Sequence, residues 1–266
     1  MMAQAAQQTQ PDTPGREAED YVLVADGISK QFGGFKAVDT VTLKVRRGSI
    51  HALIGPNGAG KTTCFNLLTK TLSLTSGSIV LNGRDISHLT SSQVARCGLV
   101  RSFQISAIFP KMTVLENMRV ALQRKAGRSY RFWQPLSTIA SLDAEAKHLL
   151  SRVQLADSHD TLAGTLSYGK KRALEIVTTL ALNPEVMLLD EPTAGMGHED
   201  IEPITELIRD SAKGRTVLMV EHNMSIVAGI CDRITVLQHG KTLAEGSYEA
   251  ISADERVISA YIGGNA

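Results

Sequence analysis

The residues with the clearest chemistry form a glycine-rich run over 55–62. It reads Gly55-Pro-Asn-Gly-Ala-Gly-Lys61-Thr62, a complete G-x-x-x-x-G-K-[ST] pattern. Glycines let the backbone curl so that successive N–H groups face one anion, and the helix expected to follow adds its positive end. Lys61 is expected to reach the β- and γ-phosphates of ATP, and the Thr62 hydroxyl to ligate Mg²⁺. The predicted phosphate-binding residues are Gly55, Pro56, Asn57, Gly58, Ala59, Gly60, Lys61, Thr62 and Thr63.

A second cluster supplies the carboxylates that a magnesium–nucleotide site needs. Asp190 and Glu191 directly follow the apolar run Val186-Met-Leu-Leu189. Asp190 is predicted to hold Mg²⁺ through water, because this ion keeps part of its hydration shell. Glu191 is placed to polarise an attacking water. Paired acids also occur at ordinary strand exits, so this assignment depends on the glycine-rich loop.

Three apolar strands must position these groups. They cover 51–54, 186–189 and 216–220, and each ends in a glycine loop or in polar residues, the last in Glu221-His222. Continuous apolar strands that alternate with helical stretches indicate a parallel α/β sheet, with ligands at the carboxyl ends of the strands. All three polar clusters fall at those ends, which predicts one shared site.

The rest of the chain divides into segments that differ in composition and hydrophobic pattern. Residues 1–20 lack apolar periodicity and are predicted to be a disordered tail, and residues 21–266 a single domain. Short β-rich runs at 22–24, 41–45 and 79–81, the last followed by Asn82-Gly83, predict a small antiparallel layer with a hairpin turn. Helical patterns replace strands over 105–165, which predicts a helical subdomain inserted in the α/β core.

Composition narrows the classes of protein. Lys and Arg number 28 against 27 Asp and Glu, a balance that argues against a general nucleic-acid binder. No apolar stretch approaches the roughly 18 residues of a membrane span, and the first twenty residues do not resemble a secretory signal. Three scattered cysteines suit a reducing compartment. These features predict a cytosolic chain that is soluble by itself.

The glycine-rich loop alone leaves several nucleotide-binding classes open. A GTPase would need an Asn-Lys-x-Asp segment, and no Asn here is followed by Lys; a small-molecule kinase is possible on the loop alone. The deciding segment is Leu166-Ser-Tyr-Gly-Lys-Lys-Arg172, which resembles the LSGGQ signature of ABC ATPases. In isolation, Ser-x-Gly before a helix is merely an N-cap.

Other elements of the ABC family follow in order, and the resemblance covers essentially residues 21–262. It implies a P-loop (RecA-like) parallel core sheet with an antiparallel β layer and a helical subdomain. It also implies a role for each matching residue. Those roles are adenine stacking by Phe32, metal contact and partner sensing by Gln104, γ-phosphate contact by His222, and grip of the opposite subunit's γ-phosphate by Ser167 and Gly169.

Three positions depart from the general pattern. Tyr168 stands where the first signature glycine is usual, and Lys170 where glutamine is usual. Gly197 replaces a D-loop aspartate that helps join two ATPase subunits. This last change leads to the hypothesis that the chain pairs with a different ATPase subunit, although a homodimer stays open.

The same deviations resemble the ATPases of branched-chain amino-acid uptake systems, as does the ending Val257-Ile-Ser-Ala-Tyr-Ile-Gly. The resemblance implies two integral membrane permeases, a second ATPase subunit, a periplasmic solute-binding protein and a place on the cytoplasmic face of the inner membrane. The alternatives are a urea or amide importer, a lipopolysaccharide exporter, and a soluble ABC ATPase that acts on DNA or ribosomes.

A basic and aromatic segment over 119–133 adds a weaker hypothesis. Arginines and Lys125 surround Tyr130, Phe132 and Trp133, a combination that suits an anionic membrane leaflet or a permease loop. A solvated loop with one aromatic anchor explains the same residues.

Overall fold

The computed structural model describes residues 21–102, 108–125 and 136–262 of the chain. Its strands are β1 (Tyr21–Phe32), β2 (Phe35–Arg46), β3 (Ile50–Ile54), β4 (Ser76–Leu81), β5 (Arg84–Asp85), β6 (Leu99–Arg101), β7 (Val186–Asp190), β8 (Thr216–Val220), β9 (Arg233–Gln238) and β10 (Lys241–Gly246). Its α-helices are α2 (Lys61–Leu68), α3 (Ser91–Arg96), α4 (Val114–Lys125), α5 (Leu136–Ser151), α6 (Tyr168–Ala181), α7 (His198–Ala212), α8 (Met224–Ile230), α9 (Tyr248–Ser252) and α10 (Glu255–Ile262). The predicted tail at 1–20 lies outside the described residues.

The larger sheet is built from six strands in the order β10-β9-β3-β8-β7-β6. Strand β3 pairs in parallel with β8 and β9, and β7 pairs in parallel with β8 and β6. This confirms the predicted parallel core and brings the ends of β3, β7 and β8 to one edge. The short strand β6 and the antiparallel pair β9–β10 were not predicted.

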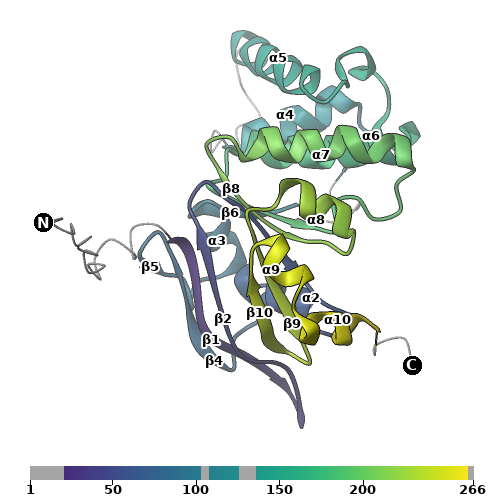
Figure 1. Ribbon diagram of the computed structural model, residues 1–266. Coiled ribbons are helices and arrows are strands. Elements are labelled where there is room, and N and C mark those ends of the chain that lie inside the picture. The colour runs from purple at the N-terminus through teal and green to yellow at the C-terminus, as the bar shows by residue number, and fades with distance from the viewer. Residues whose placement is uncertain (1–20, 103–107, 126–135, 263–266) are drawn as a thin grey trace, which may run out of the picture.

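The smaller sheet is antiparallel, in the order β2-β1-β4-β5, and confirms the predicted antiparallel layer. Strands β1 and β2 form a long hairpin that closes at the pair Phe32–Phe35 and projects from the body of the molecule (Figure 1). Asn82 and Gly83 have φ of 51° and 72° and join β4 to β5, the backbone that a tight hairpin turn requires.

Each central strand contributes to a hydrophobic core on both faces of the larger sheet. In β3, Ala52 and Ile54 belong to one core and Leu53 to the other. In β7, Leu189 and Leu188 divide in the same way, because side chains alternate along a strand. One core lies against α2 and the antiparallel layer, and the other faces the long helices. Two-sided burial explains why these strands are continuous apolar runs.

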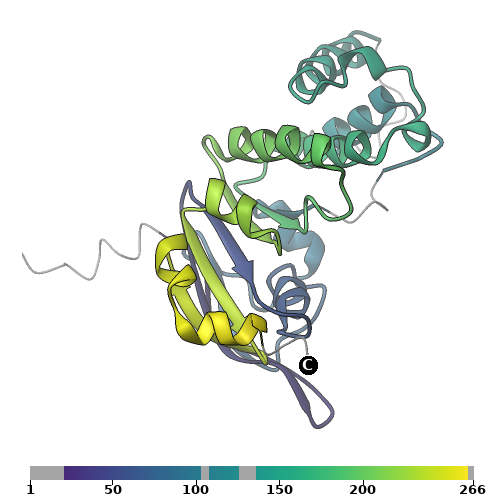
Figure 2. The same cartoon turned by 45° about the vertical axis from the view of Figure 1, so that its right-hand side comes forward.

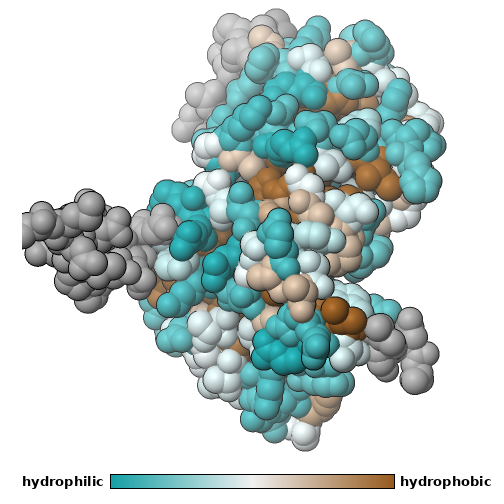
Figure 3. All heavy atoms as spheres, viewed as in Figure 1, coloured by the Kyte–Doolittle hydropathy of each residue, from teal (hydrophilic) through white to brown (hydrophobic). Residues whose placement is uncertain are grey.

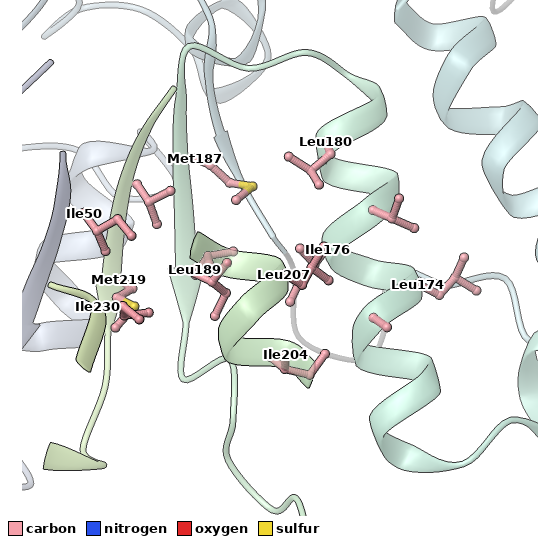
Figure 4. Packing of buried hydrophobic residues seen from close by; sticks show 14 of the residues in the cluster. Ile50, Leu174, Ile176, Leu180, Met187, Leu189, Ile204, Leu207, Met219 and Ile230 are labelled. Carbon is pink, nitrogen blue, oxygen red and sulfur yellow. The ribbon is translucent and has the colours of Figure 1, made fainter. Parts of the chain in front are cut away.

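Helices α4, α5, α6 and α7 form a layer beyond one end of the sheet (Figures 1 and 2). Within the predicted helical segment 105–165, the described residues form α4, α5 and two short 3₁₀ turns. Figure 4 shows Ile176 of α6 beside Leu207 of α7, close to Leu189 on β7, while Leu174 points to the opposite side of α6. The helical layer and the sheet therefore share one hydrophobic core.

The surface in view is mainly hydrophilic, with hydrophobic atoms gathered at the waist between the helical layer and the sheets (Figure 3). Among the helices of the described residues, none combines the length and apolar character needed to cross a bilayer.

A buried histidine in the larger sheet is expected to make the stability of the fold depend on pH. His51 on β3 has no exposed surface, and its Nε2 lies 2.8 Å from the Thr235 hydroxyl of β9. Its Nδ1 has no hydrogen-bond partner in the part of the chain that the structure describes. Burial, with a smaller effect of the Arg233 charge, lowers the pKa of His51 from 6.5 to about 3. The folded state therefore holds this ring neutral.

Below pH 6.5 the unfolded chain binds a proton on His51 that the folded chain refuses until about pH 3. Between pH 7 and pH 5 this difference is expected to remove about 2 kcal/mol from the free energy of unfolding. His51→Gln should show a correspondingly weaker loss of stability over that range in urea titrations. Identical pH profiles for the two proteins would contradict the assignment.

Candidate functional site

The phosphate loop connects β3 to α2 and is shaped by close packing behind it. Gly60 caps α2 with φ of 99°, a left-handed conformation that favours glycine. A Cβ at Gly60 would lie 2.6 Å from the carbonyl oxygen of Ala37 on β2, so a larger residue would push the two strands of backbone apart. On the other side, the Gly240 N–H donates to the carbonyl of Ala59. The loop is thus clamped between β2 and the β9–β10 turn.

Lys61 begins α2 and folds its side chain back over the loop. Its Nζ donates to the carbonyl oxygens of Gly55 and Pro56 at 2.6 and 3.0 Å. Burial lowers the pKa of Lys61, while the carboxylates of Glu191 and Asp190 act in the opposite direction. The structure therefore brings the predicted lysine and both predicted carboxylates into one electrostatic environment.

The two carboxylates at the end of β7 differ in surroundings. Asp190 is buried and pairs through Oδ2 with Arg101 at the end of β6. Glu191 is exposed and has φ of 43°, a backbone stabilised by its N–H donation to the Val220 carbonyl at 2.9 Å. This difference suits the predicted roles, in which the exposed Glu191 acts on a water and the buried Asp190 holds a metal.

The donor set fits magnesium. Within the described residues, no group of three or more His, Cys, Asp and Glu side chains forms a metal cluster. The Thr62 hydroxyl and the Asp190 carboxylate are oxygen donors, and Mg²⁺ is typically held by one or two protein oxygens with waters and substrate phosphates. The residues present match that mode of binding.

Helix α6 is tied to the end of β7 by a buried arginine. The Arg172 guanidinium donates to the backbone carbonyls of Asp190 at 2.6 Å and Pro192 at 3.1 Å. It also pairs with Glu175 at 2.5 Å. Burial raises the pKa of Glu175, and the charge of Arg172 offsets part of that rise. The helix that carries the signature segment is thus fixed to the strand that ends in Asp190, the predicted metal carboxylate.

Glu221 organises the segment after β8. Its buried Oε1 accepts from the Thr193 hydroxyl and backbone N–H at 2.5 and 3.2 Å. Its Oε2 accepts from the backbone N–H groups of His222 and Asn223 at 2.9 and 3.1 Å. The His222 side chain remains 61% exposed, so it is free to meet a ligand. One carboxylate therefore joins the loop after β7 to the loop that presents His222.

The signature residues lie apart from the phosphate loop of the same chain. Ser167 caps α6 and accepts from the Lys170 N–H at 3.4 Å. No hydrogen bond among the described residues joins Ser167 or Gly169 to residues 55–63. Gly169 instead packs so closely on α7 that an added Cβ would overlap the carboxylate of Asp200. The sequence places both halves of a phosphate site in one chain, but the fold does not bring them together.

Two predicted residues remain to be placed. Phe32 lies at the tip of the β1–β2 hairpin, 47% exposed, with the Lys30 ammonium 5.2 Å from its ring centroid. An exposed ring suits stacking, and its role with adenine stays a prediction. Gln104 lies outside the described residues.

Three residues of this site were not predicted from the sequence. Arg101, Arg172 and Glu221 were each read only as neighbours of a motif. Arg101 and Glu221 bind side chains 89 and 28 residues away, and Arg172 binds a backbone carbonyl 18 residues away, so local spacing does not encode these contacts.

The fold and this site define an ATP-binding cassette of the ABC transporter family, to which the chain belongs. The model of the family described as ABC transporter matches residues 38–194, and that described as branched-chain amino acid ATP-binding cassette transporter matches residues 241–266. Members of this family bind ATP and couple its hydrolysis to transport.

Particular relatives are similar over nearly their whole length. The high-affinity branched-chain amino acid transport ATP-binding protein LivG of Salmonella typhimurium is 40% identical over 250 residues, which cover 91% of this chain and 98% of LivG. BraF of Pseudomonas aeruginosa, a protein of the same description, is 39% identical over 249 residues, with the same coverage. A solved cassette of an ABC transporter in its ADP conformation is 30% identical with a TM-score of 0.79, and covers 91% of this chain and 99% of its own.

Replacement of Glu221 by Gln is expected to lower the free energy of unfolding by about 1–3 kcal/mol, the cost of leaving buried hydrogen-bonding groups unpaired. An amide NH₂ cannot accept from the N–H groups that now face the carboxylate. Urea unfolding measures the change. Glu202→Gln, on the exposed face of α7, is the control and should stay within about 0.5 kcal/mol of wild type; equal effects of the two changes would contradict the role of Glu221.

Proposed function

We propose that this chain is the Mg²⁺-dependent ATPase of an importer of branched-chain amino acids, bound to the cytoplasmic face of the inner membrane. The observation that carries the ATPase assignment is the convergence of Lys61, at the start of α2, with Asp190 and Glu191, at the end of β7. The cargo rests on the relatives, LivG and BraF, which are named for branched-chain amino acid transport.

In this mechanism the loop amides and Lys61 bind the phosphates, and Thr62 and Asp190 would hold Mg²⁺. Bound Mg²⁺ would offset charge on the β- and γ-phosphate oxygens. Glu191 orients and polarises water, and His222 contacts the γ-phosphate from the loop that Glu221 fixes. Gln104 completes this set as a metal contact that senses the membrane partner.

A second ATPase subunit supplies the missing half of each site. Ser167 and Gly169 do not contact their own phosphate loop, so their positive helix end is available to a γ-phosphate bound by another subunit. A Cβ added at Gly195, which has φ of 74°, would lie 3.6 Å from the Tyr168 hydroxyl, so this loop packs beside the signature residue that departs from the general pattern. Gly197 in place of the usual aspartate favours a non-identical partner over a second copy.

Two integral membrane permeases are the remaining direct partners, and a groove between α3, α4 and α6 offers them a surface. Its volume is about 580 Å³. Phe109 and Val120 line it and are 51% and 37% exposed, with Arg124 beside them. Asn117 fixes the Phe109 backbone through bonds of 2.8 and 3.1 Å. The occupant we propose is a short amphipathic helix from a permease loop, with apolar residues for Phe109 and Val120 and an acidic residue for Arg124.

A periplasmic solute-binding protein is the indirect partner that feeds the permeases. Nucleic acid is not a partner in this proposal, because the net charge is only +1. The cassette spans 21–266 with its helical subdomain at 105–165. A urea or amide importer and a lipopolysaccharide exporter share this chemistry and differ in cargo. The basic and aromatic segment keeps its membrane hypothesis, but residues 126–135 lie outside the described residues.

Glu191→Gln tests the hydrolytic assignment. The amide cannot polarise water as the carboxylate does, so turnover should fall at least about tenfold, the lower end of what positioned bases contribute. Mg–ATP binding should persist, because Lys61, Thr62 and Asp190 are unchanged. Phosphate release and equilibrium binding of a fluorescent ATP analogue measure the two quantities.

The matched control is Glu202→Gln, which makes the same change on the exposed face of α7 and should leave turnover at the wild-type rate. Wild-type turnover in Glu191→Gln would remove Glu191 from the reaction.

The adenine site is tested by two phenylalanines that face each other across the β1–β2 turn. Phe32→Ala should weaken ATP binding about tenfold, because stacking on an aromatic ring contributes about 1–3 kcal/mol per base. Phe35, 68% exposed at the same tip, provides the control, and Phe35→Ala should change affinity less than twofold. Binding of ATP relative to ribose triphosphate isolates the stacking contribution. The reverse ranking of the two variants would move the adenine platform to Phe35.

A further inference from the structure

Arg101, the last residue of β6, connects the metal carboxylate to the helix of the phosphate loop. One guanidinium nitrogen donates to Asp190 Oδ2 on β7, and another donates to Asn66 Oδ1 on α2 at 2.6 Å. The guanidinium carbon lies 5.7 Å from the centroid of the Phe65 ring. A single side chain therefore spans β7 and α2.

These contacts are largely shielded from solvent. The Arg101 side chain is 14% exposed and that of Asp190 6%. In such surroundings ion pairs and hydrogen bonds are weakly screened, and a charge left without its partner is strongly unfavourable. The planar guanidinium presents its donors in a fixed fork, so bonds to Asn66 and Asp190 set the position of the carboxylate relative to α2. Helix α2 begins with Lys61 and Thr62, the residues predicted to hold phosphate and metal.

The other carboxylate oxygen of Asp190, Oδ1, accepts no hydrogen bond from the residues that the structure describes, while the backbone carbonyl of Asp190 accepts from Arg172. We propose that Arg101 is a positioning residue that holds Asp190 with Oδ1 directed to the hydration shell of Mg²⁺. This inference rests on the proposed function, because it requires the magnesium site at Thr62 and Asp190.

Arg101 has two opposite physical effects on such a site. As a fixed hydrogen-bond partner it orients the carboxylate, and loss of partners of this kind typically costs about 10–100-fold in metal affinity. As a positive charge it repels the metal, so its removal would tighten binding. The double anchoring by Asn66 and Asp190 and the burial of the pair favour orientation as the larger effect. The two effects predict opposite signs, which an affinity measurement separates.

The same residue also lines the groove that we propose as the permease docking surface. The Arg101 side chain therefore both lines the groove and binds the Asp190 carboxylate. A segment docked against Arg101 would act on Asp190 without touching the nucleotide.

The test measures metal binding directly. The probe is Mn²⁺, which replaces Mg²⁺ and gives an electron paramagnetic resonance signal when free in solution. The full chain carries Glu191→Gln to slow hydrolysis, is loaded with ATP and is freed of unbound nucleotide before the titration, because ATP in solution itself binds Mn²⁺. Arg101→Gln and Arg101→Lys are compared with Arg96→Gln, which removes the same charge from the exposed end of α3. ATP-analogue binding in EDTA reports separately on the phosphate loop.

Arg101→Gln should weaken Mn²⁺ binding about tenfold or more, with Arg96→Gln unchanged. Arg101→Lys should also weaken it by more than threefold, since an ammonium point charge cannot hold Asn66 and Asp190 in one fork. A change of less than threefold, or tighter binding, would overturn the proposal. If Arg101→Gln does not fold, the lysine variant decides. Absence of ATP binding in the parent chain would instead contradict the proposed function.

Discussion

The structure depends on how it balances buried negative charge at the end of β7. Asp190 lies where the sheet, the signature helix and the phosphate loop meet, and it is 6% exposed. Two arginines approach this point from different elements: Arg101 pairs with the carboxylate, and Arg172 binds the backbone carbonyls of Asp190 and Pro192. A buried carboxylate without such partners would be costly. The charge that serves the metal thus also fixes the neighbouring elements.

The same contacts bear on the pairing of two ATPase subunits that we propose. Arg172 ties α6 to β7, and Glu221 ties the loop after β7 to the loop of His222. In the proposed mechanism, short and buried contacts of this kind would transmit a movement of α6 to Asp190 and His222. Ser167, at the start of α6, would then bind a phosphate held by another subunit.

Much of the architecture follows from local sequence. The runs at 51–54, 186–189 and 216–220 are apolar throughout because both faces of those strands are buried, so their parallel pairing was predictable. The Asn82-Gly83 pair was predictable as a turn because Asn and Gly tolerate the positive φ that this turn requires. Strand β10 escaped prediction because it lies at one edge of the sheet, where Lys241 and Glu245 interrupt the apolar pattern.

The residues of the candidate site also divide into those that the sequence predicts and those that it does not. Lys61, Asp190 and Glu191 were predictable because each belongs to a motif with fixed spacing. Arg101 and Glu221 were not, because their partners lie 89 and 28 residues away along the chain. Their roles depend on burial and on long-range geometry, which single-sequence patterns do not contain. The same reason separates Gly169, which the signature identifies, from Asp200, which makes a glycine necessary there.

We propose that this ATPase works through membrane permeases and a second ATPase subunit. Affinity purification of the tagged chain from detergent-solubilised native membranes, with the recovered proteins identified by mass spectrometry, tests this directly. We expect two polytopic membrane proteins and a second ATP-binding cassette in near-equal amounts. Recovery of the chain alone, or with ribosomes or DNA-bound proteins, would show that it does not work in such a transporter.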